Sequence, residues 1–144
     1  MKITIRQTQE SDYAAILKLL QDTKLCGTEF TEERFRNMLA RNREFCYAAE
    51  AKGQIVGNVF GTHDGGFIAS IRKVAVANQY RRKKIASDLV RKVVEKFDGI
   101  KIPLVYAHVE KTNNASLKML DSLGFSIRKT HYLIDKGEPK QHNK

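Results

Sequence analysis

The amino-acid sequence predicts an α/β domain of the mixed (α+β) kind, with a central, mostly antiparallel mixed sheet flanked by about four helices. Three observations lead to this class. The first 44 residues contain two segments with apolar side chains at helical spacing. The middle of the chain alternates apolar and polar residues between glycine-containing turns, and helical and strand-like segments alternate again after residue 80.

The first 44 residues predict one strand and two helices. Residues 1–6 alternate apolar and polar side chains, as a half-buried strand does. Ser11 and Asp12 offer an N-cap for a helix whose apolar side chains recur over residues 13–20. Thr31, which two glutamates follow, predicts the start of the second helix, because carboxylates are stabilised at the positive end of a helix dipole.

The middle of the chain predicts three antiparallel strands. These are residues 45–50, 54–62 and 67–76, each with an apolar pattern of period two. Lys52-Gly53 and Asp64-Gly65-Gly66 lie between them. Glycine supplies the positive φ that tight hairpin turns require, so both segments predict reversals of the chain.

Helical spacing returns after Tyr80. Apolar residues recur from Ile85 to Phe97, and Gly99 predicts the stop of this helix. Residues 102–109 then predict a buried strand, with a proline near its start, where a missing N–H costs least.

The last predicted elements are a short helix and a strand. The helix covers residues 113–123 and is closed by Gly124, and residues 125–134 return to a strand-like pattern. No repeat or linker interrupts this order of elements. We therefore expect one domain over residues 1–135 and a short polar tail over residues 136–144.

The composition is that of an ordinary globular protein. The chain has 144 residues, of which 42% are hydrophobic and 29% charged, enough to bury a core without disulfides or a metal. The first residues lack the apolar run of a signal peptide, and no segment approaches the ~20 apolar residues of a membrane helix. Cys26 and Cys46 have neither zinc-site nor redox-motif spacing. We expect a cytoplasmic protein with reduced thiols, no metal and no membrane partner.

The net charge of +10 is unevenly distributed. Residues 1–72 hold 10 basic and 9 acidic side chains, whereas residues 73–144 hold 16 basic and 7 acidic ones. The excess is compatible with a solvated basic face, a nucleic-acid surface or a site for a compact polyanion. Charge alone favours the solvated face. A nucleic-acid partner is disfavoured because aromatic side chains are not interleaved with the basic cluster.

The most informative segment is residues 74–86, where a strand leads directly into a basic loop that opens an amphipathic helix. The first N–H groups of a helix have no internal partner, and the helix dipole adds positive potential there. Four consecutive basic side chains, Arg81 to Lys84, strengthen that potential. The pattern indicates a phosphate-binding loop. It lacks the Walker lysine-serine pair, so a P-loop nucleotidase is disfavoured.

This segment resembles the cofactor-binding motif of GNAT acetyltransferases, Gln/Arg-x-x-Gly-x-Gly/Ala, with Arg81 in the first position and Ala86 in the last. Residues 113–125 resemble a second motif of that family, Asn-x-x-Ala-x-x-x-Tyr-x-x-x-Gly-Phe. The residues in register there are Asn113, Ser116, Gly124 and Phe125. The resemblance spans nearly the whole chain, and it is closest to the branch that contains the ribosomal-protein N-terminal alanine acetyltransferases.

The resemblance implies a V-shaped gap where two parallel strands, residues 67–76 and 102–109, splay apart. Backbone groups of Val74 and Val76 would pair with the pantetheine arm of acetyl-CoA, and one N–H would polarise the thioester carbonyl. Asn113 would contact the cofactor near its reactive end, or serve only as a helix N-cap. The pyrophosphate would be bound by the basic loop and the first helical turn, at Arg81, Arg82, Lys83, Lys84, Ile85, Ala86 and Ser87.

Two residues depart from the family pattern. Lys84 stands where the family usually has glycine, which puts the geometry of the loop in question. Leu120 replaces the tyrosine that usually protonates the departing thiolate. Either the thiolate leaves unassisted, or a water or another group such as Tyr132 donates the proton. The loss is expected to weaken the reaction without preventing it.

The acceptor amine must lose a proton before it can attack. The branch carries a glutamate five residues before the motif asparagine, and His108 occupies that position here. Histidine titrates near neutral pH, so His108 is the candidate base, although a histidine in a strand is often only packed or solvated. Ser70 occupies the position of the base in other members and could orient a water. Glu110 is a second candidate for the base, and His63 is expected to be a turn residue.

By resemblance, the chain is expected to be an N-acetyltransferase that transfers the acetyl group of acetyl-CoA to a primary amine in a ternary complex. The alternative is a coenzyme A-binding sensor or interaction module with weak catalysis, which the two departures motivate. The acceptor stays open among peptide N-termini, antibiotics, amino acids and other small amines, with a mild preference for an acidic context. The protein is expected to be a monomer or a homodimer.

Overall fold

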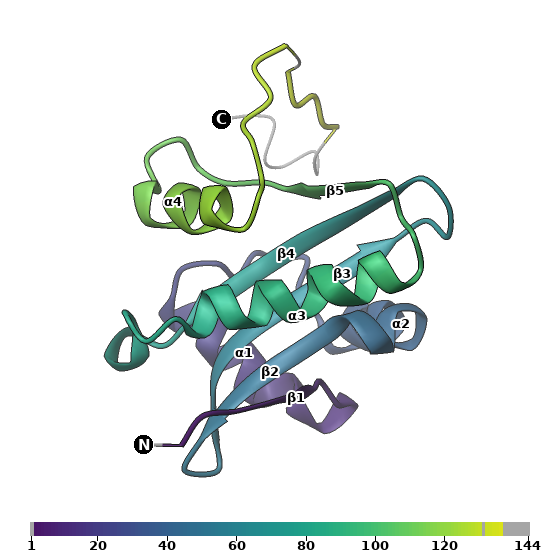
Figure 1. The fold of residues 1–144 in the computed structure, drawn as a ribbon. Helices are drawn as coiled ribbons and strands as arrows, with labels where there is room; N and C mark the ends of the chain where they lie inside the picture. Colours follow the sequence, from purple (N-terminus) through teal and green to yellow (C-terminus); the bar gives the residue numbers. More distant parts are fainter. Residues whose placement is uncertain (1, 131, 137–144) are drawn as a thin grey trace.

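The computed structural model describes residues 2–130 and 132–136 and consists of one five-stranded sheet with helices on both faces (Figure 1). Helix α3 crosses one face, α1 and α2 lie on the other, and α4 follows β5 at the sheet edge. The strands are β1 (Thr4–Gln7), β2 (Cys46–Ala51), β3 (Gln54–His63), β4 (Ile68–Val76) and β5 (Leu104–Ala107). The helices are α1 (Tyr13–Asp22), α2 (Glu32–Asn42), α3 (Ile85–Gly99) and α4 (Asn114–Ser122). The predicted class, a mixed sheet with four helices, is confirmed.

The sheet order is β1-β2-β3-β4-β5, with antiparallel pairing throughout except that β5 runs parallel to β4. Both predicted turns are present. Lys52 and Gly53 have φ of 53° and 76° and join β2 to β3 through a two-residue turn of the kind that suits the twist of a hairpin. Asp64 closes the turn before β4, since its carboxylate accepts hydrogen bonds from the N–H groups of residues 66, 67 and 68 at 2.8–3.2 Å.

The two faces of the sheet have separate hydrophobic cores. On one face, α3 buries Leu89, Val93 and Phe97 against β2, β3 and β4. On the other face, side chains of α1 and α2 pack against Phe60 and Ala75 of the sheet. This packing gives α3 a fixed position over the sheet, and the loop before α3 is positioned with it.

The α1 N-terminus differs from the prediction. Asp12 is the N-cap residue by position, but its carboxylate bonds to no N–H of the helix. It instead accepts hydrogen bonds from both terminal nitrogens of Arg6, at 2.8 and 3.0 Å, and from Gln9 N–H at 2.8 Å. A guanidinium that donates two hydrogen bonds to a carboxylate binds it more strongly than a helix N–H does, so the Asp12 carboxylate pairs with Arg6. The prediction for α2 is confirmed, since the Thr31 side chain accepts a hydrogen bond from Arg34 N–H at 3.2 Å.

The C-terminus of α3 differs from the prediction, whereas that of α4 agrees with it. Gly99 is the last residue of α3, and the left-handed residue that ends the helix is Lys101, with φ of 60°. The N–H of Ile102 bonds to the carbonyl of Phe97, which completes a Schellman motif. At α4, Gly124 takes the same left-handed position, with φ of 94°, as predicted.

The strand predicted over residues 125–134 is wrong for the described part of that segment. Residues 125–130 and 132–134 contain no strand, and β5 is shorter than the predicted 102–109. Phe125 packs against the α3-side core, but Ile127, Tyr132 and Ile134 are exposed. A strand-like pattern forms a strand only where an edge pairs with it, and no described residue pairs with the outer edge of β5. The predicted polar tail lies, beyond Lys136, outside the described residues.

No helix in the described residues is long and apolar enough to cross a membrane. Both cysteines carry free thiols, Cys46 buried and Cys26 half-buried. Burial raises the pKa of the Cys46 thiol to about 11, so Cys46 behaves as a small core side chain.

Candidate functional site

Strands β4 and β5 pair only at their beginnings. The last register pair is Ile71 with Ala107, and β4 continues for five further residues, 72–76, that β5 does not follow. Figure 1 shows the two strands side by side where they start and separating toward their ends. The edge of β4 that faces away from β3 therefore offers unpaired main-chain groups to a ligand, as the predicted V-shaped gap requires.

A β-bulge lies at the point where the strands separate. Phe60 pairs with Arg72 and Asn58 with Ala75, so two residues of β4, Lys73 and Val74, lie opposite one residue of β3. Lys73 has φ of 55°, and its carbonyl accepts a hydrogen bond from the Asn58 side chain at 2.9 Å. Asn58 is fully buried. The bulge is therefore fixed from within the sheet.

The Lys73 side chain connects this bulge to the segment between α1 and α2. Its ammonium donates to the carbonyl of Leu25 at 2.6 Å and lies 3.2 Å from the carboxylate of Glu29. Burial alone would raise the pKa of Glu29, but hydrogen bonds, including the one from Lys73, outweigh this and lower it. The α1–α2 connection is thereby held beside the gap.

The basic loop and the first turn of α3 present six consecutive N–H groups, from Arg82 to Ser87, with no hydrogen-bond acceptor in the described part of the chain. The first helical bond is donated by Asp88. Arg81 instead turns back, and its Nε donates to the carbonyl of Val76 at 3.3 Å, which joins the loop to the end of β4. The main-chain donors and the positive side chains together fit a diphosphate.

The lysine in the glycine position keeps the loop geometry. Lys84 has φ of 63° and Arg82 has φ of 64°, the left-handed conformation that glycine adopts without strain. Residues of alternating handedness turn successive N–H groups toward one side and form an anion-binding nest. The Lys84 substitution therefore leaves the backbone path in place, at a cost of about 1–2 kcal/mol for a residue with a Cβ.

His108 is the first residue after β5 and lies just past the last β4–β5 pair. Burial alternates along this segment. Val105, Ala107 and Val109 pack against the α3-side core, whereas Tyr106 and His108 are exposed. The α3 side of the gap is thus filled, and the face carrying His108 is open.

Two more residues share that open face. Ser70 is the register partner of Tyr106, and Arg72 is the register partner of Phe60, which packs against α1 and α2. Both lie next to the point of separation. Glu110, the second candidate for the base, is also exposed and lies two residues beyond His108.

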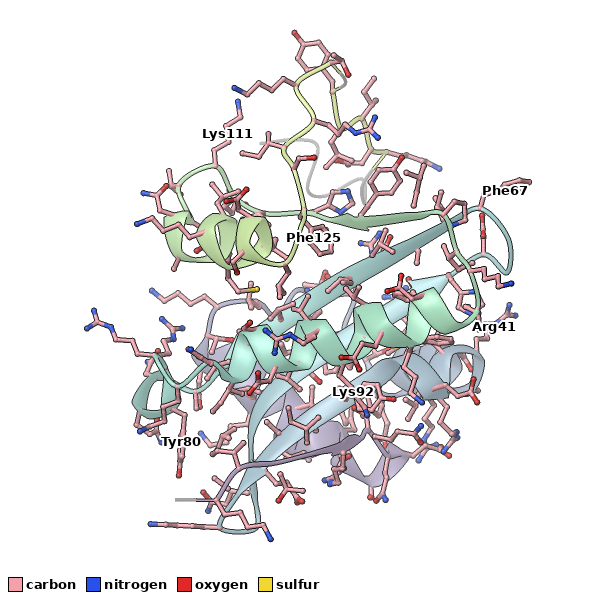
Figure 2. The ribbon with its side chains drawn as sticks, in the orientation of Figure 1. Arg41, Phe67, Tyr80, Lys92, Lys111 and Phe125 are labelled. Carbon is pink, nitrogen blue, oxygen red and sulfur yellow. The ribbon has the colours of Figure 1, made fainter. Side chains whose placement is uncertain are left out.

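The residues of the second motif have mainly structural contacts. The Asn113 side chain accepts a hydrogen bond from Ser116 N–H at 3.1 Å and so caps α4, which leaves its amide N–H₂ available to a ligand. Leu120 is buried in the α3-side core. In Figure 2, Phe125 lies between β5 and α3, where it also contacts this core. Tyr132 is 93% exposed, so its placement supports no role as proton donor.

His63, which was expected in the turn, is instead the last residue of β3 and borders the turn. Its Nδ1 accepts a hydrogen bond from Gly65 N–H at 2.9 Å, and its ring contacts Phe45 edge-on at a centroid distance of 4.9 Å. These contacts stabilise the turn at the far end of β3. In the same turn, Figure 2 shows Phe67 projecting away from the sheet.

A cavity also lies away from this gap. It has a volume of about 740 Å³ and lies between α1, the β2–β3 hairpin and the residues that follow β4. Its polar lining includes the Arg6–Asp12 pair and Glu50. None of the site residues predicted from sequence lines it. No group of three or more potential metal-ligating side chains occurs in residues 2–130 and 132–136.

Sequence reasoning missed the structural roles of Asn58 and Lys73. Asn58 gave a usable signal, since it is a polar residue inside the apolar run 55–60 and a buried polar group needs a specific partner. Lys73 gave none, because a β-bulge in a strand of alternating residues has no marker without glycine.

Two comparisons of the sequence identify relatives of this chain. The family model described as the acetyltransferase (GNAT) family matches residues 13–125. An N-alpha-acetyltransferase 30 of Dictyostelium discoideum is 30% identical over 98 residues, which cover 64% of this chain and 51% of that protein. The aligned region thus spans about half the length of that relative.

Solved structures have the same fold. Ard1 from Thermoplasma volcanium has a TM-score of 0.78 and 21% identity, with 89% of this chain and 85% of that chain covered. The NatC complex bound to a Gag peptide and CoA contains a chain with a TM-score of 0.78 and 23% identity, with 90% and 87% covered.

Proposed function

Because the chain belongs to the acetyltransferase (GNAT) family, its domain chemistry is acetyl transfer from acetyl-CoA to an amine, and we propose that a peptide N-terminus is the acceptor. One observation best supports the use of acetyl-CoA. A gap opens beside residues 72–76 of β4, and the loop after that strand presents six free N–H groups. An extended chain with a diphosphate at one end is the ligand that fits a strand edge continued by an anion-binding loop.

The main-chain groups of Val74 and Val76 would bind the pantetheine arm along the free edge of β4. The N–H groups of residues 82–87 would hold the pyrophosphate. The Asn113 amide would contact acetyl-CoA near its reactive end. When bound, acetyl-CoA supplies an acetyl group activated as a thioester. An N–H of the β4 edge would donate a hydrogen bond to the thioester carbonyl, a contribution of about 2.7–4 kcal/mol in comparable sites.

The acceptor would approach on the open face, because the opposite face is filled by the α3-side core. His108 lies at the opening and would accept the proton that the ammonium of the acceptor must lose. The choice of a peptide N-terminus rests on the names of the relatives, an N-alpha-acetyltransferase and a NatC complex bound to a peptide.

Mass spectrometry of peptides incubated with acetyl-CoA tests the proposal. We expect the acetyl group on the α-amine of a peptide that also carries an internal lysine, and no transfer to the same peptide with a blocked N-terminus. Acetylation of the lysine side chain alone, or of small amines alone, would contradict the choice of acceptor.

The role of His108 has its own test. His108→Ala should lower kcat about a hundredfold, added imidazole should restore part of the rate, and Glu110→Gln should change it little. An unchanged rate in His108→Ala would remove this residue from the mechanism.

The alternative, a coenzyme A-binding module with weak catalysis, draws its support from Leu120, which is buried and has no hydroxyl. Tight binding of acetyl-CoA without thiol release from any amine would favour it. We also propose a cytoplasmic location, in keeping with two free thiols, and cell fractionation tests it.

A further inference from the structure

We propose that Arg72 makes the enzyme selective for acceptors with a carboxylate in their first two residues. This inference rests on the proposed peptide acceptor and adds a substrate class to it. Arg72 is not among the residues that the sequence motifs identify, and the proton transfer and cofactor binding proposed above do not use its side chain.

The strand register places Arg72 at the reactive end of the gap. Arg72 is the first residue of β4 beyond the last pair with β5, Ile71 with Ala107. Its register partner on β3 is Phe60, whose side chain packs with α1 and α2. Arg72 therefore lies on the open face, from which an acceptor must enter.

The charge of Arg72 is uncompensated. Its side chain is exposed and makes no ion pair with any residue in 2–130 or 132–136. The carboxylate of Glu29, in the α1–α2 connection, lies 3.2 Å from the ammonium of Lys73, the residue that follows Arg72 in the sequence. Of these two adjacent cations, Lys73 therefore stabilises the fold, and Arg72 is available to bind a ligand.

The chemistry of a guanidinium selects the partner. Its planar fork of N–H donors matches a carboxylate with two parallel hydrogen bonds, whereas it repels the cation of a lysine or arginine side chain. A charge-assisted pair at the edge of a site changes affinity by about tenfold or more. An aspartate or glutamate beside the acceptor amine is the group that can reach Arg72 while the amine is at the gap.

Isosteric peptides test the inference. Acetylation is measured for peptides that carry aspartate or asparagine first, and for peptides with serine first and glutamate, glutamine or lysine second. The enzymes are the wild type, Arg72→Gln, Arg72→Glu and Arg72→Lys. Arg41→Gln is the matched control, because Arg41 is an exposed arginine of α2 that, in the described residues, also has no ion pair. Circular dichroism checks that each variant is folded.

We expect kcat/KM to be at least tenfold higher for an acidic peptide than for its amide isostere at one of the two positions. Arg72→Gln should bring that ratio of kcat/KM values to about one. Arg72→Glu should favour the lysine peptide, and Arg72→Lys should keep part of the preference for the acidic peptide. Arg41→Gln should leave the ratio as in the wild type.

Equal rates with acidic and amide peptides in the wild type would overturn the role of Arg72 and leave the peptide acceptor intact. A ratio that falls equally in Arg41→Gln would also overturn it, since the effect would then be one of overall charge. Absence of acetylation at any peptide N-terminus would overturn the proposed function and this inference with it.

Discussion

At the scale of single residues, Lys73 shows how one side chain can join two parts of the site. Its carbonyl is held by Asn58, and its ammonium is held by Leu25 and Glu29. Only a residue with a long cationic side chain and a left-handed backbone can make all these contacts at once. The strain of the bulge is therefore offset by contacts that keep the α1–α2 connection beside the gap.

The Lys73 contact can be removed without removing the bulge. Lys73→Met keeps the length of the side chain and the carbonyl bond to Asn58 but loses the contacts to Leu25 and Glu29. We expect KM for the acceptor to rise several-fold while the Kd for acetyl-CoA, measured by calorimetry, stays unchanged. Lys18→Met is the control, because Lys18 has only an exposed pair within α1. A rise in the Kd for acetyl-CoA would instead mean that Lys73 shapes the cofactor side.

A second residue-scale prediction concerns acid stability. Burial alone would raise the pKa of Asp12, but hydrogen bonds from Arg6 and from Gln9 N–H outweigh this and lower it. The unfolded chain therefore binds the Asp12 proton at a higher pH than the folded protein does. The stabilisation is complete above the ordinary carboxyl pKa of about 3.9 and is lost as the pH falls through the lower folded-state value.

Urea unfolding at several pH values measures this effect. Asp12→Asn should lower the free energy of unfolding by about 1–3 kcal/mol at pH 7 and should lose less stability than the wild type below pH of about 4. Asp22→Asn, which removes one partner of an exposed pair, should change the free energy of unfolding by less than about 0.5 kcal/mol. Parallel pH curves for Asp12→Asn and the wild type would show that another group causes the acid sensitivity.

At the scale of elements, the sequence predicted type and order well and the ends of elements less well. Helix α3 was predictable because its buried residues recur at helical spacing, and β2, β3 and β4 because glycine marks their turns. The end of α3 was predicted at the wrong residue because Lys101 adopts the left-handed conformation that glycine usually adopts at this position. The strand over 125–134 failed because pairing depends on a neighbouring edge that local sequence does not report.

The same contrast holds for the site. The six free N–H groups lie where the basic loop predicted them, because a helix N-terminus leaves them unpaired by its geometry. The bulge of Lys73 and the placement of Arg72 depend on the register between β3 and β4. Register is a long-range property, so the motifs indicated the loop of free N–H groups but not the residues that we propose for the acceptor side.

The left-handed helix ends give an element-scale prediction. Lys101→Gly should raise the free energy of unfolding by about 1 kcal/mol, because glycine adopts a φ of 60° without a clash of its Cβ. Gly124→Ala, at the corresponding position of α4, should lower it by a similar amount. Thermal unfolding of both variants measures the difference, and equal shifts in the same direction would show that the Schellman geometry does not govern these ends.

At the scale of the whole molecule, the site depends on how closely α3 approaches the sheet. Two glycines of β3 permit this approach, Gly57 beneath the first turn of α3 and Gly61 beneath its later turns. A Cβ on Gly57 would lie 3.0 Å from Ile85 and 3.1 Å from Leu89, and a Cβ on Gly61 would lie 2.7 Å from both Val93 and the carbonyl oxygen of Phe45. The helix has 15 residues, and the two glycines lie beneath different turns of it.

These two positions should separate stability from cofactor binding. Gly61→Ala meets a main-chain oxygen that cannot rotate away, so it should cost about 1–3 kcal/mol of stability and leave the Kd for acetyl-CoA unchanged in the folded protein. Gly57→Ala meets side-chain ends that can move, so its cost should be smaller. However, Gly57 pairs with Val76 and underlies Ile85, and a shift there displaces the loop of free N–H groups. We therefore expect a several-fold higher Kd by calorimetry for Gly57→Ala, and an unchanged Kd would mean that the loop keeps its position independently of α3.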